Sequence, residues 1–242
     1  MRVALDEDFH VHSAFSDDAE STVAENVAAA RRRGLRTVCI ADHVRRGTAW
    51  VPELVAAVAA CRGAAGPRVL AGVEAKILDT AGRLDLPAAL DGIDLVLIAD
   101  HQFPGERGPV HPDRVRASIA GGELSPAAAI EQVCAATAGA VADTGRGRVV
   151  AHLFSLLPKI GLAEDEVPAS LLGALAAKIA RSGAMVEVNE KWRCPTAGTV
   201  AALARAGVPV VAGSDSHHCR HVGVYRSVAR TASLLSVTGL RG

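Results

Sequence analysis

Short apolar runs alternate with alanine-rich helical stretches along the whole of this 242-residue chain. Most runs are apolar at successive positions, which is typical of strands buried on both faces of a parallel sheet. Seven such units in a chain of this length favour a closed α/β barrel over an open sheet, built as one domain over residues 1–242. The first run ends at His10, and the others are residues 37–41, 69–73, 93–99, 149–151, 184–189 and 208–213.

Helix signals occupy most of the intervals between these runs. Ser21 is the expected N-cap of a helix over residues 23–33, and Pro52 opens a second helix that fades near Gly63. Residues 102–122 show no clear element, so we expect a long functional loop there. Further helices are predicted at about residues 126–143, 168–181, 196–206 and 225–235.

Charge and composition exclude several classes of protein. Lys plus Arg and Asp plus Glu number 26 each, so no general attraction to long nucleic acid or to an anionic membrane is expected. No apolar run approaches the roughly 20 residues needed to span a bilayer. The first eight residues turn acidic, unlike a signal peptide, and the five scattered cysteines form no C-x-x-C pair. We expect a cytoplasmic protein, with the oligomeric state left open.

Metal-ligating residue types gather at the carboxyl ends of the apolar runs. In a β/α barrel that rim carries the active site. Six of the nine histidines fall there with three carboxylates, which is too many ligands for one tetrahedral ion and suits two or three ions of Zn, Mn or Fe. His111, His218 and His221 lie in loops and are expected to be structural. The rim residues are His10, His12, Asp17, His43, Glu74, His101, His152, Asp215 and His217.

The ordered motifs resemble those of the PHP (polymerase and histidinol phosphatase) superfamily. Residues 8–17, 41–43, 72–74 and 213–217, with His101 and His152, carry the resemblance over nearly the whole chain. It implies a distorted (β/α)7 TIM-like barrel with three divalent metal ions. By this resemblance one ion takes His10, His12, Glu74 and Asp215, a second takes Glu74, His101 and His152, and the third takes Asp17, His43 and His217.

This resemblance also implies a hydrolase acting on phosphoric ester bonds. The favoured hypothesis is a phosphomonoesterase in which a metal-bridging hydroxide attacks phosphorus. Glu74 would serve as the bridging carboxylate. Asp215 and His217 are candidate proton donors to the leaving group by position, and that role is left open.

Basic and aromatic residues near the predicted ligands are candidates for substrate binding. Cations within a few residues of the rim can contact phosphate, and aromatic side chains can form a wall for a ring-bearing small molecule. Histidinol phosphate, a nucleotide or a phosphorylated pathway intermediate would fit such a site. The candidates are Arg45, Lys76, Lys191, Arg193 and Arg220 for phosphate, and Phe15, Phe103 and Trp192 for the ring.

Three other functions remain open from the sequence. A phosphodiesterase or exonuclease of the same fold could act on cyclic or short nucleotides. A metal-dependent amidohydrolase would share the His10-x-His12 pattern but usually needs a lysine or carboxylate where this chain has His101. A non-catalytic regulatory domain would be expected to have lost ligands, and none of the nine is missing.

Overall fold

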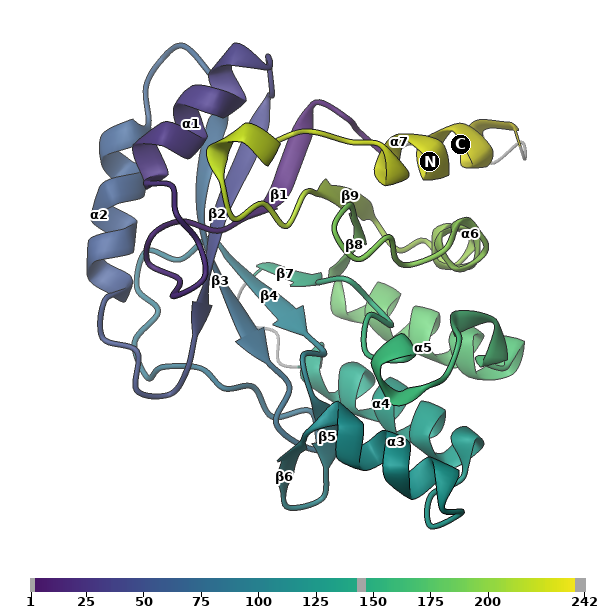
Figure 1. The fold of residues 1–242 in the computed structure, drawn as a ribbon. Helices are drawn as coiled ribbons and strands as arrows, with labels where there is room; N and C mark the ends of the chain where they lie inside the picture. The colour runs from purple at the N-terminus through teal and green to yellow at the C-terminus, as the bar shows by residue number, and fades with distance from the viewer. Residues whose placement is uncertain (1–2, 143–146, 238–242) are drawn as a thin grey trace.

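Parallel strands form the centre of the molecule in the computed structural model, which describes residues 3–142 and 147–237 (Figure 1). Within these ranges seven strands share one sheet in the order β1-β2-β3-β4-β7-β8-β9. A parallel bridge between Val11 and Ser216 joins the two edges, so the sheet is a nearly closed barrel and the predicted fold is confirmed. The strands are β1 (Glu7–Val11), β2 (Thr37–Val44), β3 (Arg68–Lys76), β4 (Leu95–Ala99), β7 (Gly147–Val150), β8 (Met185–Asn189) and β9 (Val210–Gly213).

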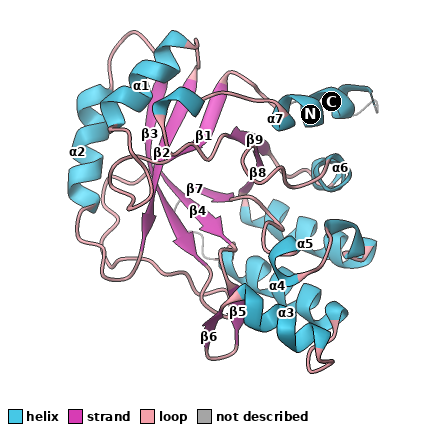
Figure 2. Ribbon diagram, viewed as in Figure 1, coloured by secondary structure: helices cyan, strands magenta, loops and turns pink. Residues whose placement is uncertain are grey.

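Helices surround this barrel (Figure 2). Helices α1 and α2 cover the side of β2 and β3, and α4 to α7 lie on the opposite side (Figure 1). Residues 77–94, which join β3 to β4, contain no helix, and this is one distortion of the regular β/α pattern. The helices are α1 (Val23–Arg32), α2 (Val51–Cys61), α3 (Pro112–Ala120), α4 (Pro126–Ala140), α5 (Ala169–Ser182), α6 (Ala197–Arg205) and α7 (Ser227–Val237), with 3-10 turns η1 (Pro158–Ile160), η2 (Glu164–Glu166) and η3 (Cys219–His221).

The structure corrects one predicted helix cap. The N-cap of α1 is Thr22 rather than Ser21, because Thr22 and Glu25 form a reciprocal capping box. Ser21 instead accepts a hydrogen bond from the backbone N–H of Cys219, at 2.8 Å. The end predicted for α4 near Asp143 lies outside the described residues.

The segment predicted to be an irregular loop, residues 102–122, contains regular structure. A hairpin of β5 (Phe103–Gly105) and β6 (Gly108–Val110) precedes α3. The prediction was wrong because the hairpin turn and the start of α3 both lack the residues that usually mark such features. The residues at the turn, Glu106 and Arg107, are not typical hairpin residues, and the cap of α3 is His111, whose Nδ1 accepts from Asp113 N at 3.2 Å.

Alternate strand residues fill the barrel, and their chemistry changes along its axis. Near the amino ends they form an apolar cluster that includes Cys39, Leu70, Met185 and Val211. At the carboxyl ends the same periodic positions become polar, since side chains of one strand face the same side at every second residue. The successive positions are Cys39, Ala41 and His43 on β2; Leu70, Gly72 and Glu74 on β3; and Met185, Glu187 and Asn189 on β8.

None of the helices formed by residues 3–142 and 147–237 has the length and apolar character required to cross a lipid bilayer.

Candidate metal centre

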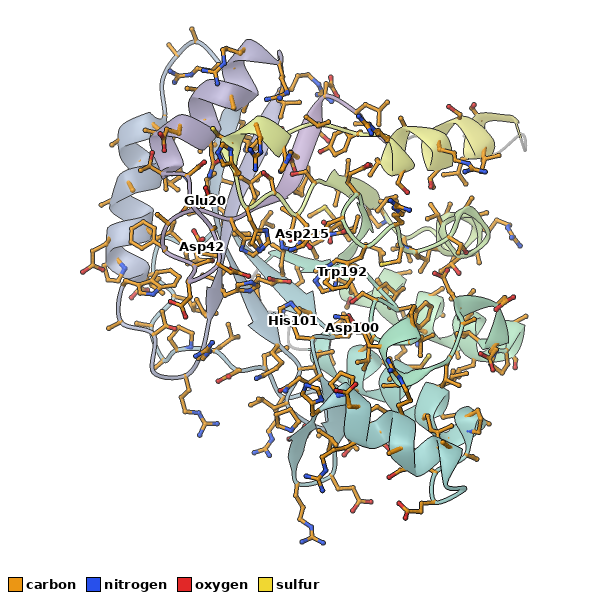
Figure 3. All side chains as sticks on the ribbon, in the orientation of Figure 1. Glu20, Asp42, Asp100, His101, Trp192 and Asp215 are labelled. Atoms are coloured by element: carbon orange, nitrogen blue, oxygen red, sulfur yellow. The ribbon has the colours of Figure 1, made fainter. Side chains whose placement is uncertain are left out.

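The carboxyl ends of the strands bring eight of the nine predicted ligands together. Figure 3 labels two of them, His101 and Asp215, close to one another at the centre of the molecule. Four overlapping groups have ligand atoms that all lie within 4.8 Å of one another. These groups are His12, His43 and His217; His10, Glu74 and His152; His10, His12 and Asp215; and His43, Glu74 and His101.

Glu74 lies at the centre of this cluster, and both of its carboxylate oxygens face imidazoles. Its Oε1 is 2.9 Å from His152 Nε2 and 3.1 Å from His101 Nε2. Its Oε2 is 2.8 Å from His43 Nδ1, 3.5 Å from His10 Nε2 and 3.6 Å from His12 Nε2. One carboxylate therefore connects ligands from both sides of the barrel mouth, as a bridging ligand must.

The residues present fit divalent cations. Glu74 Oε2 is buried and accepts no hydrogen bond from the described residues, although three ring nitrogens surround it. His10 Nε2 and His12 Nε2 face each other at 3.0 Å. Inward-facing imidazole nitrogens around a carboxylate with free lone pairs are the donor set that Zn, Mn and Fe accept.

Charge states in the cluster also suit metal ligation. Burial would raise the pKa values of Glu74 and Asp215, but neighbouring imidazoles hold both well below their ordinary range. Burial, together with repulsion from His10, lowers the pKa of His12 to about 3. The two carboxylates are thus ionised and His12 is neutral, which are the forms that bind a cation.

Two other histidines show the negative potential of the site. Burial would lower the pKa of His10, but Glu187, Glu74 and Asp215 raise it well above its ordinary value. Burial likewise opposes protonation of His152, and Asp100 and Glu74 outweigh it to raise that pKa to about 10. Without metal, these carboxylates therefore stabilise positive charge on the rings.

Buried carboxylates around the cluster hold the histidines in place. Glu187 Oε1 is 3.0 Å from His10 Nδ1, and its Oε2 accepts from the backbone N–H of His152 at 2.8 Å. Asp100 Oδ1 is 3.2 Å from His152 Nδ1, and its Oδ2 accepts from Leu156 N at 3.2 Å. Outer carboxylates of this kind fix the orientation and tautomer of a ligating imidazole.

Two more buried carboxylates, Asp8 and Asp42, brace the backbone around the cluster. Asp8 accepts from the N–H groups of Ser214 at 2.9 Å and Gly223 at 2.8 Å, and burial raises its pKa to about 6 despite these bonds. Asp42 accepts from the N–H and the hydroxyl of Ser13, both at 2.7 Å. These contacts tie the loop after β1 to β2 and the segment after β9 to β1.

These four carboxylates were not among the residues predicted to be functional. A usable signal existed for Glu187, which interrupts an otherwise apolar strand, because a buried charge needs a partner. Asp8, Asp42 and Asp100 each lie within two positions of a predicted ligand, and this closeness in sequence is the signal that could have identified them.

Backbone strain is found at two of the predicted ligands. His152 has φ of 31° and Asp215 has φ of 54°, both in the left-handed region that non-glycine residues rarely occupy. The hydrogen bonds of Asp215 N to His10 O at 2.8 Å and of His152 N to Glu187 hold these conformations. Strain maintained in this way is typical of functional sites.

Asp17 is the one predicted ligand outside the four groups. It is exposed and lines the cavity beside the cluster. The neighbouring Asp18 is instead close to the histidines, with its Oδ2 3.2 Å from His217 Nε2 and 3.6 Å from His43 Nε2. Ligation by Asp17 stays a prediction, and Asp18 is a residue that the sequence analysis missed.

A cavity of about 870 Å³ opens above the cluster. Of the predicted substrate-binding residues it is lined by Phe15, Arg45, Lys76, Lys191 and Trp192. Trp50, which the sequence analysis did not single out, also lines it and pairs with Phe15 at 5.2 Å between ring centroids. Lys191 Nζ is 3.3 Å from Asp215 Oδ1, so a cation stands directly beside a predicted ligand.

Three predicted substrate-binding residues do not line this cavity. Phe103 is 4% exposed and packs in the core between the barrel and α4. Arg193 is exposed and has φ of 56°. Arg220 is exposed on η3, where its carbonyl accepts from Arg33 Nη2 at 2.7 Å. Proximity in sequence to a strand end did not place these side chains at the site, because the chain turns away from the rim immediately after it.

The histidines expected to be structural lie outside the four metal-binding groups. His111 caps α3 and His218 caps η3, in each case by accepting a backbone hydrogen bond through Nδ1. His221 lies beside His218, with 6.3 Å between the ring centroids.

Comparison with known proteins identifies the family and the fold of this chain. The PHP domain family model matches residues 8–191. A protein named probable phosphatase, from Caldanaerobacter subterraneus subsp. tengcongensis, is 36% identical over 113 residues, which are 42% of this chain and 41% of that protein. A probable phosphatase from Vibrio cholerae is 32% identical over 130 residues, 51% of each chain. The matches thus span about two fifths to one half of these relatives.

One solved structure shares the fold over nearly its whole length. It is histidinol phosphate phosphatase from Lactococcus lactis subsp. lactis, in complex with zinc, L-histidinol and phosphate. The TM-score is 0.71 at 18% sequence identity, and the match covers 96% of this chain and 93% of that one. At this identity the likeness establishes the architecture.

Proposed function

Because the chain belongs to the PHP domain family, we propose that it is a metal-dependent phosphatase that releases phosphate from a small phosphomonoester. The observation that carries this proposal is the cluster around Glu74, whose ligand atoms converge below a cavity of about 870 Å³. The names of its sequence relatives point to the same activity.

The nine predicted ligands, with Asp18 as a tenth candidate, would hold two or three divalent ions. When bound, such ions lower the pKa of the attacking water and neutralise negative charge on the phosphoryl oxygens. His217 Nδ1 is 2.9 Å from the carbonyl oxygen of Asp215, so neutral His217 donates through Nδ1 and presents the lone pair of Nε2 as a ligand. Asp215, ionised under the influence of His10 and His12, suits ligation rather than donation of a proton.

The chain's own cations orient the phosphate. Lys191 Nζ lies 3.3 Å from Asp215 Oδ1 and 3.3 Å from His217 Nε2, where it can contact a phosphoryl or leaving-group oxygen. Lys76 donates to Gln102 Oε1 at 3.3 Å, which holds its ammonium at the opposite wall. Arg45 completes the basic lining.

The aromatic lining favours a ring-bearing leaving group. Phe15 and Trp50 form one apolar wall, and Trp192 lies 6.2 Å from the ring of His152 on the other side. Histidinol phosphate, a nucleoside monophosphate or an aromatic pathway intermediate fits this space. The two walls support this choice of substrate over a plain sugar phosphate.

Phosphate release and metal content measured on one preparation test the proposal. We expect two to three metal ions per chain and release from a panel of histidinol phosphate, nucleotides and sugar phosphates, with one ester preferred. Glu74→Gln should lower kcat/KM on the order of 1,000-fold because it removes the central carboxylate. His221→Ala, at an exposed histidine that lines neither the cluster nor a neighbouring cavity, is the matched control. Full metal occupancy with no phosphate released from any ester would refute the activity.

A further inference from the structure

A second, smaller cavity borders the one described above. It has a volume of about 380 Å³ and lies between α3, η1 and the segment after β4. His101 and Gln102 line both cavities, so the two cavities are adjacent and separated by these side chains. Its remaining lining includes the charged side chains of Lys159, Arg116 and Asp113.

Lys159 provides a cation without an acidic partner. Its Nζ lies 3.9 Å from the centroid of the Trp192 ring, which places the ammonium on an aromatic face. Lys191 Nζ is 5.9 Å from the same centroid, so one indole is shared by two cations. Among the described residues no carboxylate lies within ion-pair distance of Lys159. Burial lowers the pKa of Lys159, which reflects partial loss of water from the ammonium.

Arg116 adds a second cation to the same cavity. One guanidinium nitrogen donates to the carbonyl oxygen of Lys159, which fixes the side chain of α3 against η1. The other terminal nitrogen is 3.9 Å from Asp113 Oδ1, at the limit of an ion pair. With Lys159 and Arg116 positive and Asp113 negative, the lining has a net positive charge when His111 is neutral.

We propose that this cavity binds a second anionic group of the substrate, a carboxylate or a phosphate, between Lys159 and Arg116. The scissile phosphate would then be held at the cluster around Glu74. This inference rests on the proposed function and narrows it to phosphomonoesters with an additional anionic group. A partly dehydrated ammonium and a guanidinium in the lining of one cavity favour such a group and disfavour a substrate whose distal end is an amine.

Non-hydrolysable ligands test this proposal without depending on turnover. Calorimetric Kd values would be measured for the metal-loaded protein with propylphosphonate, 3-phosphonopropionate and propane-1,3-bisphosphonate. We expect at least one of the two doubly anionic ligands to bind about tenfold more tightly than propylphosphonate, and which one does so identifies the group. Lys159→Met should abolish this preference while changing the Kd of propylphosphonate less than threefold.

Two variants sharpen the comparison. Lys178→Met removes an exposed lysine of α5 that lines neither cavity, and it should leave all three Kd values unchanged. Asp113→Asn removes the negative charge from the lining and should strengthen the preference for two anionic groups, which a purely structural role of Lys159 would not predict.

Equal or undetectable binding of the three ligands by the wild-type protein would overturn the subsite. A Lys159→Met variant that weakens all ligands by the same factor would overturn it too, because Lys159 would then serve the scissile phosphate. The proposed activity is judged separately by phosphate release. A protein that releases no phosphate but keeps the tenfold preference retains the anion subsite and loses the phosphatase assignment.

Discussion

Glu187 Oε1 lies 3.0 Å from His10 Nδ1, and neither side chain has any exposed surface. The second oxygen of Glu187 accepts the backbone N–H of His152, so one carboxylate on β8 positions a side chain on β1 and the main chain after β7. With Nδ1 donating to Glu187, His10 directs Nε2 toward Glu74. The distance between two predicted ligands of the same cluster is therefore set by a residue that would not itself touch the metal.

Gly213 makes room for this carboxylate, and Gly213→Ala should damage the site. A Cβ at residue 213 would overlap the side chain of Glu187, which is fully buried and held by His10 and His152. We expect metal affinity and kcat/KM to fall roughly 10- to 100-fold, the usual cost of losing an outer carboxylate. Equilibrium dialysis against metal and steady-state kinetics would measure both.

The matched control is Gly173→Ala in α5. A Cβ there meets no atom within 4 Å, and alanine is a better helix former than glycine. The free energy of unfolding should rise by about 0.5–1 kcal/mol with unchanged kinetics. Wild-type metal affinity in Gly213→Ala would show that Glu187 does not position His10.

Phe15→Leu should alter substrate choice. The Phe15–Trp50 pair lines the main cavity, and an aromatic contact contributes about 0.5–1.5 kcal/mol beyond area burial. We expect KM for a ring-bearing ester to rise roughly 3- to 10-fold, with little change for glycerol phosphate. Phe103→Leu, in the buried core, should lower the melting temperature and leave the ratio of the two KM values unchanged. A uniform effect of Phe15→Leu on both esters would count against the aromatic wall.

Asp79→Asn should change how stability depends on pH. Burial would raise the pKa of Asp79, but hydrogen bonds from the Arg83 side chain and from the N–H groups of Arg83 and Ala81 lower it below its ordinary value. A carboxylate with a lower pKa in the folded chain stabilises the fold above the unfolded-state pKa of about 3.9 and loses this effect as pH falls through the folded-state pKa.

The loss in Asp79→Asn should therefore be about 1 kcal/mol at pH 7 and should shrink toward zero below about pH 4. Urea denaturation at pH 7, 5 and 3.5 would measure it. A difference between wild-type and variant protein that is constant over this range would contradict the assignment of the stability to the ionised carboxylate.

The barrel, and the clustering of eight predicted ligands at its rim, could be predicted because both follow from strand periodicity. Parallel strands end at a common rim, so His43, Glu74 and His152 had to meet once their strands were recognised. The same periodicity would also have directed Glu187 into the barrel, but a lone charge in an apolar strand does not show which partner it finds.

Side chains on loops were harder to place than those on strands. Asp17 and Asp18 are adjacent in sequence, and only the path of the loop after β1 decides which carboxylate turns toward His217. Phe103 and Arg193 are close to the rim in sequence, yet a hairpin strand and a left-handed turn direct them elsewhere. The proposed anion-binding subsite at Lys159 depends on the packing of α3 against η1, and no local sequence pattern predicts this contact.

The bridge between Val11 and Ser216 has a consequence for how this protein acquires its site. His12 N donates to Ser216 O at 2.8 Å, and Asp215 N donates to His10 O at 2.8 Å, so predicted ligands that follow the first and last strands meet at the seam of the barrel. The contacts between β1 and β9 can form only after β9 has been synthesised, because they join residues that are far apart in the sequence. We therefore expect this seam to close late in folding. Any metal bound earlier would be held by an incomplete set of the predicted ligands, so we expect full loading to follow translation of β9.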